Sequence, residues 1–311
     1  MRKTNHLFSK SAVFVLITIV AFINASCSTK VSNNNNLVIP SAASSNKNIQ
    51  PLIIGVLPTQ SLKEQQRMIE PLEEYSEQSL ETQVNFQVAT DYKQVVKWLV
   101  DEKIDIAYVS AVSYLEAREA GAQIEPLVAP IDKYTGRPWY RSVVVVKADS
   151  NIKTLQQLRG KRFAFVNKSS TSGYLMPFTA FKKLGINPEE ECEIIYPGTH
   201  AKTLAALKNG DIDAATTNFP YYLKQQKLGK LKSEFQVIWE SPPIPPSLIV
   251  VSKKLSPDTI KKLKTTFLKT PEGIEDIFEG QSAGYTSIED ADYTPIRKLR
   301  DSLNLNKKAM Q

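Results

Sequence analysis

From residue 51 onward, short apolar runs alternate with stretches of helical periodicity. Helical patterns cover residues 61–79, interrupted by Pro71, and residues 92–102, which follow Asp91 as a potential N-cap. The runs that predict strands are residues 52–57, 82–88, 104–109, 124–129, 141–147, 162–167, 192–196, 213–218, 235–240 and 248–252. The pattern after residue 252 is mainly helical. Strands that alternate with helices predict an α/β fold with mainly parallel sheets.

Two segments break this rhythm and predict how the chain is divided. One surrounds Tyr140, and the other is the proline-rich run 241–246. Crossings at residues 139–141 and 241–246 would make residues 142–240 one lobe. Residues 51–138 and 247–311 would together form the other lobe. Two lobes joined by two crossings predict a cleft that opens and closes about a hinge.

The N-terminus has the pattern of an export signal. Arg2 and Lys3 precede an apolar run, residues 11–23, which is shorter than the roughly 20 residues that a membrane-spanning helix needs. We therefore expect residues 1–26 to be a signal peptide. The following residues 27–50 are rich in serine and asparagine and predict a flexible tether.

Cys27 is the candidate for lipid attachment. It follows Ala25 and Ser26, small residues of the kind that precede a lipidated cysteine, and lipid there would anchor the protein to the membrane. Asn24 stands where an apolar residue is usual, so ordinary cleavage nearby is the alternative. The only other cysteine is Cys192, so a lipidated Cys27 leaves no intrachain disulfide.

Charge gives no indication of a nucleic-acid partner. The formal net charge is +7, but removing residues 1–26 leaves 36 basic and 32 acidic residues. The small excess is spread along the chain, and lysine-rich stretches such as residues 261–264 have the spacing of a solvated helix face. We expect no binding to nucleic acid.

Polar residues gather where the predicted strands end, which is where open α/β sheets bind ligands. They are hydroxyls, one imidazole and one amide, without a carboxylate cluster or the spacing of metal ligands, so no metal or cofactor is expected. The residues are Thr59, Tyr92, Tyr108, Ser170, Thr171, Ser172, His200 and Asn218.

The run Ser170-Thr171-Ser172-Gly173 follows a predicted strand and begins a predicted helix. A helix N-terminus presents unpaired N–H groups and a positive dipole end, and three hydroxyls add further donors, so the run suits an anion. Plain helix capping is the alternative. His200, the only histidine left after export, begins another predicted helix, where it is either a ligand contact or a local hydrogen-bonding partner.

Residues 169–177, with the sequence Ser-Ser-Thr-Ser-Gly-Tyr-Leu-Met-Pro, resemble the signature of the phosphate/phosphite/phosphonate substrate-binding proteins of ABC transporters. Other matching segments occur in the family's order, at residues 105–107, 140–142, 149–150, 158–161, 198–200, 210–214, 239–241 and 244–245. The resemblance implies a two-lobed, type II periplasmic-binding fold. It also implies an exported, monomeric, non-enzymatic protein of the periplasm or cell surface, which passes its ligand to a permease and its ATPase.

The same resemblance implies which residues hold the ligand. The phosphorus group would contact Tyr92, Tyr140, Ser170, Thr171, Ser172 and His200. Aminophosphonate-binding members hold the ammonium with two acids, whereas the equivalent positions here are Pro220 and Ser247. Because an ammonium buried without a counter-charge is costly, we expect phosphite, phosphate or a small alkylphosphonate rather than 2-aminoethylphosphonate.

Two other functions compete with transport. A sensory domain with the same fold would signal through a separate membrane protein. A hydrolase would use Ser170 or Ser172 with His200, but the chain lacks a Gly-x-Ser-x-Gly elbow, and no acid is obviously placed to orient His200.

Overall fold

The computed structural model describes residues 50–133, 136–231, 233–274, 276–277 and 282–304. The expected signal peptide, Cys27 and residues 27–49 of the expected tether lie outside the described residues. The described residues belong to one compact unit, which contains two β-sheets. Within the described part of the chain, none of the helices is both apolar enough and long enough to traverse a bilayer.

The first sheet has six strands and is mixed. In spatial order its strands are β11 (Ser282–Ser287), β4 (Ile124–Asp132), β10 (Leu248–Ser252), β3 (Ile106–Val109), β1 (Leu52–Val56) and β2 (Val84–Val88). Strand β1 runs parallel to β2 and β3, whereas β10 and β11 pair antiparallel to their neighbours. The helices that accompany this sheet are α1 (Leu62–Leu80), α2 (Tyr92–Val100), α3 (Ala111–Glu119), α8 (Pro257–Leu268), η3 (Asp290–Tyr293) and α9 (Thr294–Ser302).

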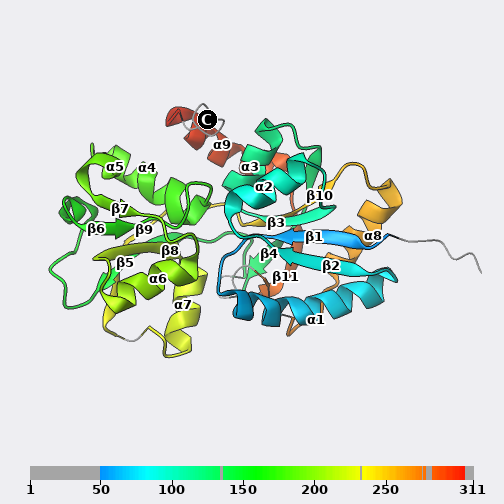
Figure 1. The fold of residues 1–311 in the computed structure, drawn as a ribbon, viewed down its shortest axis with the longest axis horizontal. Helices are drawn as coiled ribbons and strands as arrows, with labels where there is room; N and C mark the ends of the chain where they lie inside the picture. The colour runs from blue at the N-terminus through cyan, green and yellow to red at the C-terminus, as the bar shows by residue number, and fades with distance from the viewer. Residues whose placement is uncertain (1–49, 134–135, 232, 275, 278–281, 305–311) are drawn as a thin grey trace, which may run out of the picture. The chain divides into compact units, whose positions relative to one another are not determined.

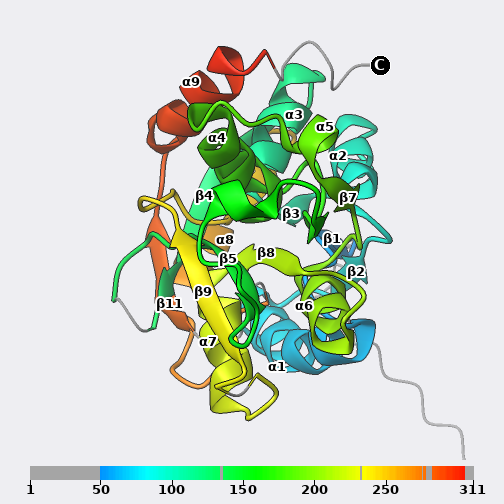
Figure 2. The same ribbon diagram turned by 90° about the vertical axis from the view of Figure 1, so that its left-hand side faces the viewer.

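The second sheet has five strands and is also mixed. Its order is β7 (Glu193–Ile195), β6 (Arg162–Ala164), β8 (Ala214–Asn218), β5 (Ser142–Lys147) and β9 (Phe235–Glu240). Its helices are η1 (Leu155–Leu158), η2 (Thr171–Leu175), α4 (Met176–Lys183), α5 (Pro188–Glu191), α6 (His200–Asn209) and α7 (Phe219–Lys227). Helix α4 covers one face of this sheet, and α6 and α7 cover the other (Figures 1 and 2).

The valine run of β5 shows why the second sheet is buried on both faces. Val144 and Val146 pack into the cluster that contains Phe163, whereas Val143 and Val145 pack into the cluster that contains Leu204. Side chains alternate between the two faces of a strand, so a continuous apolar run supplies a core on each face. The run therefore marks a central strand, and β5 lies between β8 and β9.

The predicted α/β class is confirmed, and both sheets are mixed rather than wholly parallel. In each sheet a central strand that follows a crossing runs antiparallel to both of its neighbours: β5 in the second sheet and β10 in the first. The chain passes between the sheets after β4 and again after β9, and the passages meet where Tyr140 and Ile244 form an antiparallel bridge. The boundaries expected for the two lobes stay a prediction. We use "first lobe" and "second lobe" for the elements of the first and second sheets.

Two local expectations also change. Helix α1 continues through Pro71, which lies on the exposed side of the helix, whereas Met68 and Leu72 lie on its buried side. Strand β11 lies in the C-terminal region that was expected to be helical. It is an edge strand in which only Tyr285 is buried, so its sequence carries no alternating apolar pattern.

Candidate functional site

A small polar cavity lies between the two sheets, at the carboxyl ends of several strands. It is lined by Leu57, Thr59, Tyr92, Ser110, Tyr140, Ser170, Ser172, His200, Asn218 and Ser247. Its volume of about 10 Å³ is close to what a single water molecule needs. Contacts between the lobes close over this cavity, and a space of this size does not admit a large solute.

Most of the site residues predicted from the sequence line this cavity. They are Thr59, Tyr92, Tyr140, Ser170, Ser172, His200 and Asn218. Tyr108 and Thr171 are not among the lining residues. The Tyr108 side chain is fully buried, with its hydroxyl 3.3 Å from that of Tyr285, so it belongs to the core of the first lobe.

Five helix N-termini converge on the cavity. Each of the helices α2, α3, α6 and α7, and the π-helical turn η2 that runs into α4, contributes a lining residue at its N-cap or first position. These residues are Tyr92, Ser110, Ser170, His200 and Asn218. Helix N-termini carry partial positive charge, so their convergence favours an anion in the cavity.

Ser170 is the central residue of the predicted anion loop. Its hydroxyl accepts a hydrogen bond from the backbone N–H of Gly173 at 3.0 Å, and it is also hydrogen bonded to the Tyr92 side chain. Burial raises the pKa of Tyr92 well above its ordinary value, and the Ser170 contact offsets this only in part. Tyr92 therefore stays protonated at neutral pH and keeps a proton to donate.

The rest of the loop is held in place by the surrounding backbone. The hydroxyl of Ser142, at the start of β5, donates to the carbonyl of Ser172 at 2.5 Å. The hydroxyls of Ser110 and Ser113 donate to the carbonyl of Ser169 at 2.8 and 3.2 Å. These bonds satisfy the carbonyls of Ser169 and Ser172 and hold the loop against β5 and α3.

Thr171 connects the two lobes and does not line the cavity. Its hydroxyl oxygen accepts a hydrogen bond from the backbone N–H of Val112, in helix α3 of the first lobe, at 3.1 Å. The residue is fully buried. The sequence placed this hydroxyl on the ligand, whereas the structure places it at the N-terminus of α3, where it stabilises the closed arrangement of the lobes.

We expect Thr171→Val to weaken ligand binding through this contact. The substitution leaves the Val112 N–H buried without its acceptor, which costs about 1–3 kcal/mol in the closed form. Isothermal titration calorimetry measures the loss, with Thr265→Val, a hydroxyl on the surface of α8, as the control. Unchanged affinity in Thr171→Val would mean that the Val112 contact does not contribute to closure.

His200 is a neutral hydrogen-bonding residue in this form. Its Nδ1 lies 3.0 Å from the hydroxyl of Thr217, and burial lowers its pKa to about 3. Thr217 is a hydroxyl partner, so the contact does not supply the carboxylate of a catalytic triad. A ring that bonds Thr217 through Nδ1 has Nε2 left for a ligand oxygen.

The lowered pKa of His200 predicts that acid destabilises the ligand-free protein. A folded pKa below the unfolded value near 6.5 means that the contribution of neutral His200 is complete above pH 6.5 and is lost as the pH falls toward 3. Between pH 7 and 5 we expect a loss of about 2 kcal/mol in the free energy of unfolding.

Urea titrations at the two pH values measure this loss. The control is His200→Asn, which should remove most of it, because the described residues contain no other histidine. An equal loss in the variant and the parent would contradict the assignment to His200.

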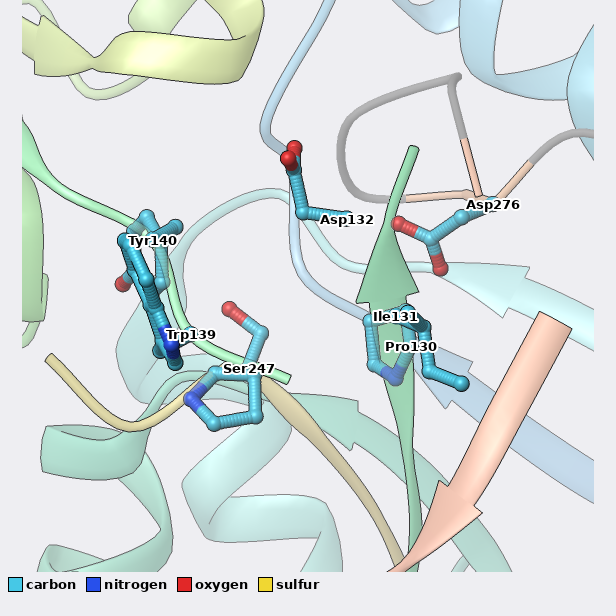
Figure 3. A pocket seen from close by; sticks show the side chains of 8 residues that line it. Pro130, Ile131, Asp132, Trp139, Tyr140, Ser247 and Asp276 are labelled. Carbon is cyan, nitrogen blue, oxygen red and sulfur yellow. The ribbon is translucent and has the colours of Figure 1, made fainter. Parts of the chain in front are cut away.

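A second cavity shares a wall with the first. It is lined by Pro130, Ile131, Asp132, Trp139, Tyr140, Pro246, Ser247 and Asp276, so Tyr140 and Ser247 face both spaces. Figure 3 shows Trp139, Tyr140 and Ser247 on one side of it and Asp276 on the other. The two aspartates are buried, with exposed fractions of 7% for Asp132 and 1% for Asp276.

Sequence reasoning missed several residues of these cavities. Ser110 could have been predicted as a site residue, because it directly follows β3 and precedes a helix, whereas Tyr108 lies inside the strand. The resemblance marks Ser247 only as the position of a missing acid, and Leu57 directly follows strand β1 without a polar group to draw notice. Asp132 and Asp276 carried no local signal, because they lie far apart in the sequence. Among the residues with defined placement, no group of three His, Cys, Asp or Glu side chains is arranged to hold a metal ion.

Comparisons with known proteins agree with this architecture. Residues 54–293 match the sequence profile of a family described as "ABC transporter, phosphonate, periplasmic substrate-binding protein". A phosphate-import protein of Mycolicibacterium smegmatis is 28% identical over 275 residues, which cover 81% of this chain and 85% of the relative. The phosphonates-binding periplasmic protein of Escherichia coli is 32% identical over 259 residues, covering 80% of this chain and 75% of the relative.

A solved structure shows the same fold. PhnD1 of Prochlorococcus marinus, in complex with methylphosphonate, superimposes with a TM-score of 0.72 over 81% of this chain and 98% of that one, at 23% sequence identity. At this level of identity the match supports the two-lobed fold.

Proposed function

Because this chain belongs to the family of periplasmic, phosphonate substrate-binding proteins of ABC transporters, we propose that it captures a small phosphorus oxyanion in the cavity between its lobes. The ligand is phosphite, phosphate or a small alkylphosphonate. The E. coli relative is named for phosphonates and the M. smegmatis relative for phosphate import, and both names fit an oxyanion of phosphorus.

One observation supports this proposal most strongly. Five helix N-termini converge on a cavity that has no charged residue in its lining. The lining residues are hydroxyls, one amide, one neutral imidazole and one leucine. Such a cavity balances an anion with dipoles and hydrogen-bond donors alone. A cationic ligand would find no counter-charge on this lining and would lose its hydration.

Each side of the cavity has its own part in binding. The loop at Ser170 and Ser172, with His200 and Asn218, belongs to the second lobe and receives the oxyanion. The amide oxygen of Asn218 accepts from the backbone N–H of Tyr221 at 2.7 Å, which leaves its NH₂ group to donate to the ligand. Tyr92 and Thr59 of the first lobe then close over the bound anion, and the closed form docks on the permease.

Calorimetric titration with phosphite, phosphate, methylphosphonate and 2-aminoethylphosphonate tests this function. We expect at least one of the first three to bind and to raise the melting temperature by mass action. Absence of binding by every phosphorus oxyanion would overturn the proposal. The expectation against 2-aminoethylphosphonate was based on Pro220 and Ser247 alone, and it fails if this ligand binds more tightly than the other three.

We also propose that the exported protein is a monomer held at the membrane by lipid on Cys27. The Ser- and Asn-rich residues 27–50 would let the binding lobes reach the permease. Mass spectrometry of the mature N-terminus tests the anchor. A diacylated Cys27 is the expected result, and an unmodified N-terminus at another residue would contradict it.

A further inference from the structure

Lys224 and Glu64 form a partly buried ion pair that joins the two lobes away from the cavity. Lys224 lies in α7 of the second lobe and Glu64 in α1 of the first, and the ammonium nitrogen is 3.1 Å from the nearer carboxylate oxygen. The Lys224 side chain is only 7% exposed, and its nitrogen is also 3.8 Å from the sulfur of Met68. The ammonium of Lys224 has therefore lost most of its hydration in the closed form.

The pair joins two helices that each follow a cavity residue in the chain. Asn218, which lines the cavity, is the N-cap of α7, and α1 begins shortly after Thr59, which lines the cavity from the other lobe. A contact between the two helices therefore holds Asn218 and Thr59 on facing sides of the cavity. Opening the cleft has to separate Lys224 from Glu64.

The two partners are not equivalent, because Glu64 has a second cation. Arg67, one turn along the same helix, lies 3.1 Å from the Glu64 carboxylate. The pKa of Glu64 is lowered to about 2, first by the hydrogen bond from Arg67 and also by Lys224. Within the described residues, Glu64 is the only carboxylate in ion-pair contact with Lys224. Loss of Lys224 thus leaves Glu64 with Arg67, whereas loss of the Glu64 charge leaves Lys224 buried without a counter-ion.

We propose that Lys224 and Glu64 are positioning residues that act as a latch, stabilising the closed cleft and slowing release of the ligand. The latch rests on the proposed function only for its effect on ligand release, because it acts on the closed form whether or not a ligand is bound. Because the two partners are not equivalent, the latch predicts different effects for replacing each of them. Glu64→Gln favours the open form more strongly than Lys224→Met, since opening returns the stranded ammonium to water.

The populations of the open and closed forms test the latch without a ligand. Spin labels at Lys97→Cys in α2 and Lys208→Cys in α6, in a background that carries both Cys27→Ser and Cys192→Ser, report the distance between the lobes. We expect Glu64→Gln to shift the distribution toward longer distances and Lys224→Met to shift it less. Adding Lys224→Met to Glu64→Gln should restore shorter distances, because it removes the buried charge.

Arg67→Gln is the matched control, since it removes the other cation on Glu64 and leaves the Lys224–Glu64 ion pair in place. It should leave the distance distribution unchanged. An effect of Arg67→Gln equal to that of Glu64→Gln, or a double variant that is more open than Glu64→Gln alone, would overturn the latch.

Release kinetics give the second readout, with methylphosphonate as the probe. Stopped-flow measurements should show release from Glu64→Gln that is faster on the order of tenfold, with the association rate nearly unchanged. Altered lobe distances without binding of any phosphorus oxyanion would uphold the latch and refute the ligand. Normal binding, release and lobe distances in Glu64→Gln would uphold the ligand and refute the latch.

Discussion

Gly173→Ala should reduce the affinity for the phosphorus oxyanion by at least roughly 100-fold, the largest effect on binding that we expect from a single methyl group. A β-carbon at this position would lie 2.4 Å from Cβ of Val166, 2.5 Å from its Cγ2 and 2.8 Å from the Ser170 hydroxyl oxygen. Two of these atoms belong to a fully buried side chain, so the loop has to move instead.

The loop cannot move without losing its geometry, because Gly173 is held from both sides. Its N–H donates to Ser170, and its carbonyl accepts from the backbone N–H of Val166 and from the hydroxyl of Thr216, both at 2.9 Å. A displaced Gly173 takes Ser170 and Ser172 out of position. Calorimetry measures the loss of affinity, and thermal unfolding checks that the variant still folds, with a stability loss of about 1–3 kcal/mol from overpacking.

The matched control for this variant is Gly185→Ala. Gly185 ends helix α4 with a positive φ of 71°, and a β-carbon there has no neighbour within 4 Å. Its replacement should lower stability by roughly 1 kcal/mol and leave affinity unchanged. Wild-type affinity in Gly173→Ala would show that the loop is not the anion site.

Phe165→Ala should lower the free energy of unfolding by about 3–5 kcal/mol, the largest effect on stability that we expect. The ring is fully buried in an aromatic cluster beneath the anion loop. It lies edge-on to Phe163 and Tyr174, with centroid distances of 4.8 and 5.0 Å, and stacks on Tyr196 at 6.0 Å. Removing it leaves a cavity where the π-helical turn rests on the sheet.

Urea denaturation measures this loss, and Phe165→Leu is the matched control. Leucine refills part of the space and should recover more than half of the loss. Because Tyr174 belongs to the turn that begins after Ser170, we also expect weaker ligand binding in Phe165→Ala. A destabilisation below about 1 kcal/mol would show that the cluster does not support the loop.

Apart from β11, the order of the strands was readable from the sequence because burial patterns are local. The four valines of β5, the Asp91 cap of α2 and the hydroxyl run at Ser170 each have a cause within a few residues. Strand direction is not local. The apolar residues 248–252 predict a buried strand whichever direction the strand runs. Only the return of the chain from the second lobe determines that β10 is antiparallel to β3.

The candidate site was predictable where a residue stands at the start of a helix, and less so elsewhere. Ser170, His200 and Asn218 were found by their position between a strand and a helix. Thr171 has the same position, but its hydroxyl reaches across to Val112, a contact that depends on the packing of two lobes. The buried Asp132 and Asp276, and the pairing of Lys224 with Glu64, join distant segments and leave no trace in the local pattern.

A crystal structure of the protein grown with methylphosphonate is the most direct measurement of the central claim. We predict that the phosphorus oxygens lie within hydrogen-bonding distance of Ser170, Ser172 and His200, with the helix N-termini of both lobes directed at them. Methylphosphonate bound elsewhere, or held mainly by lysine or arginine side chains, would contradict an anion site built from helix dipoles and hydroxyls.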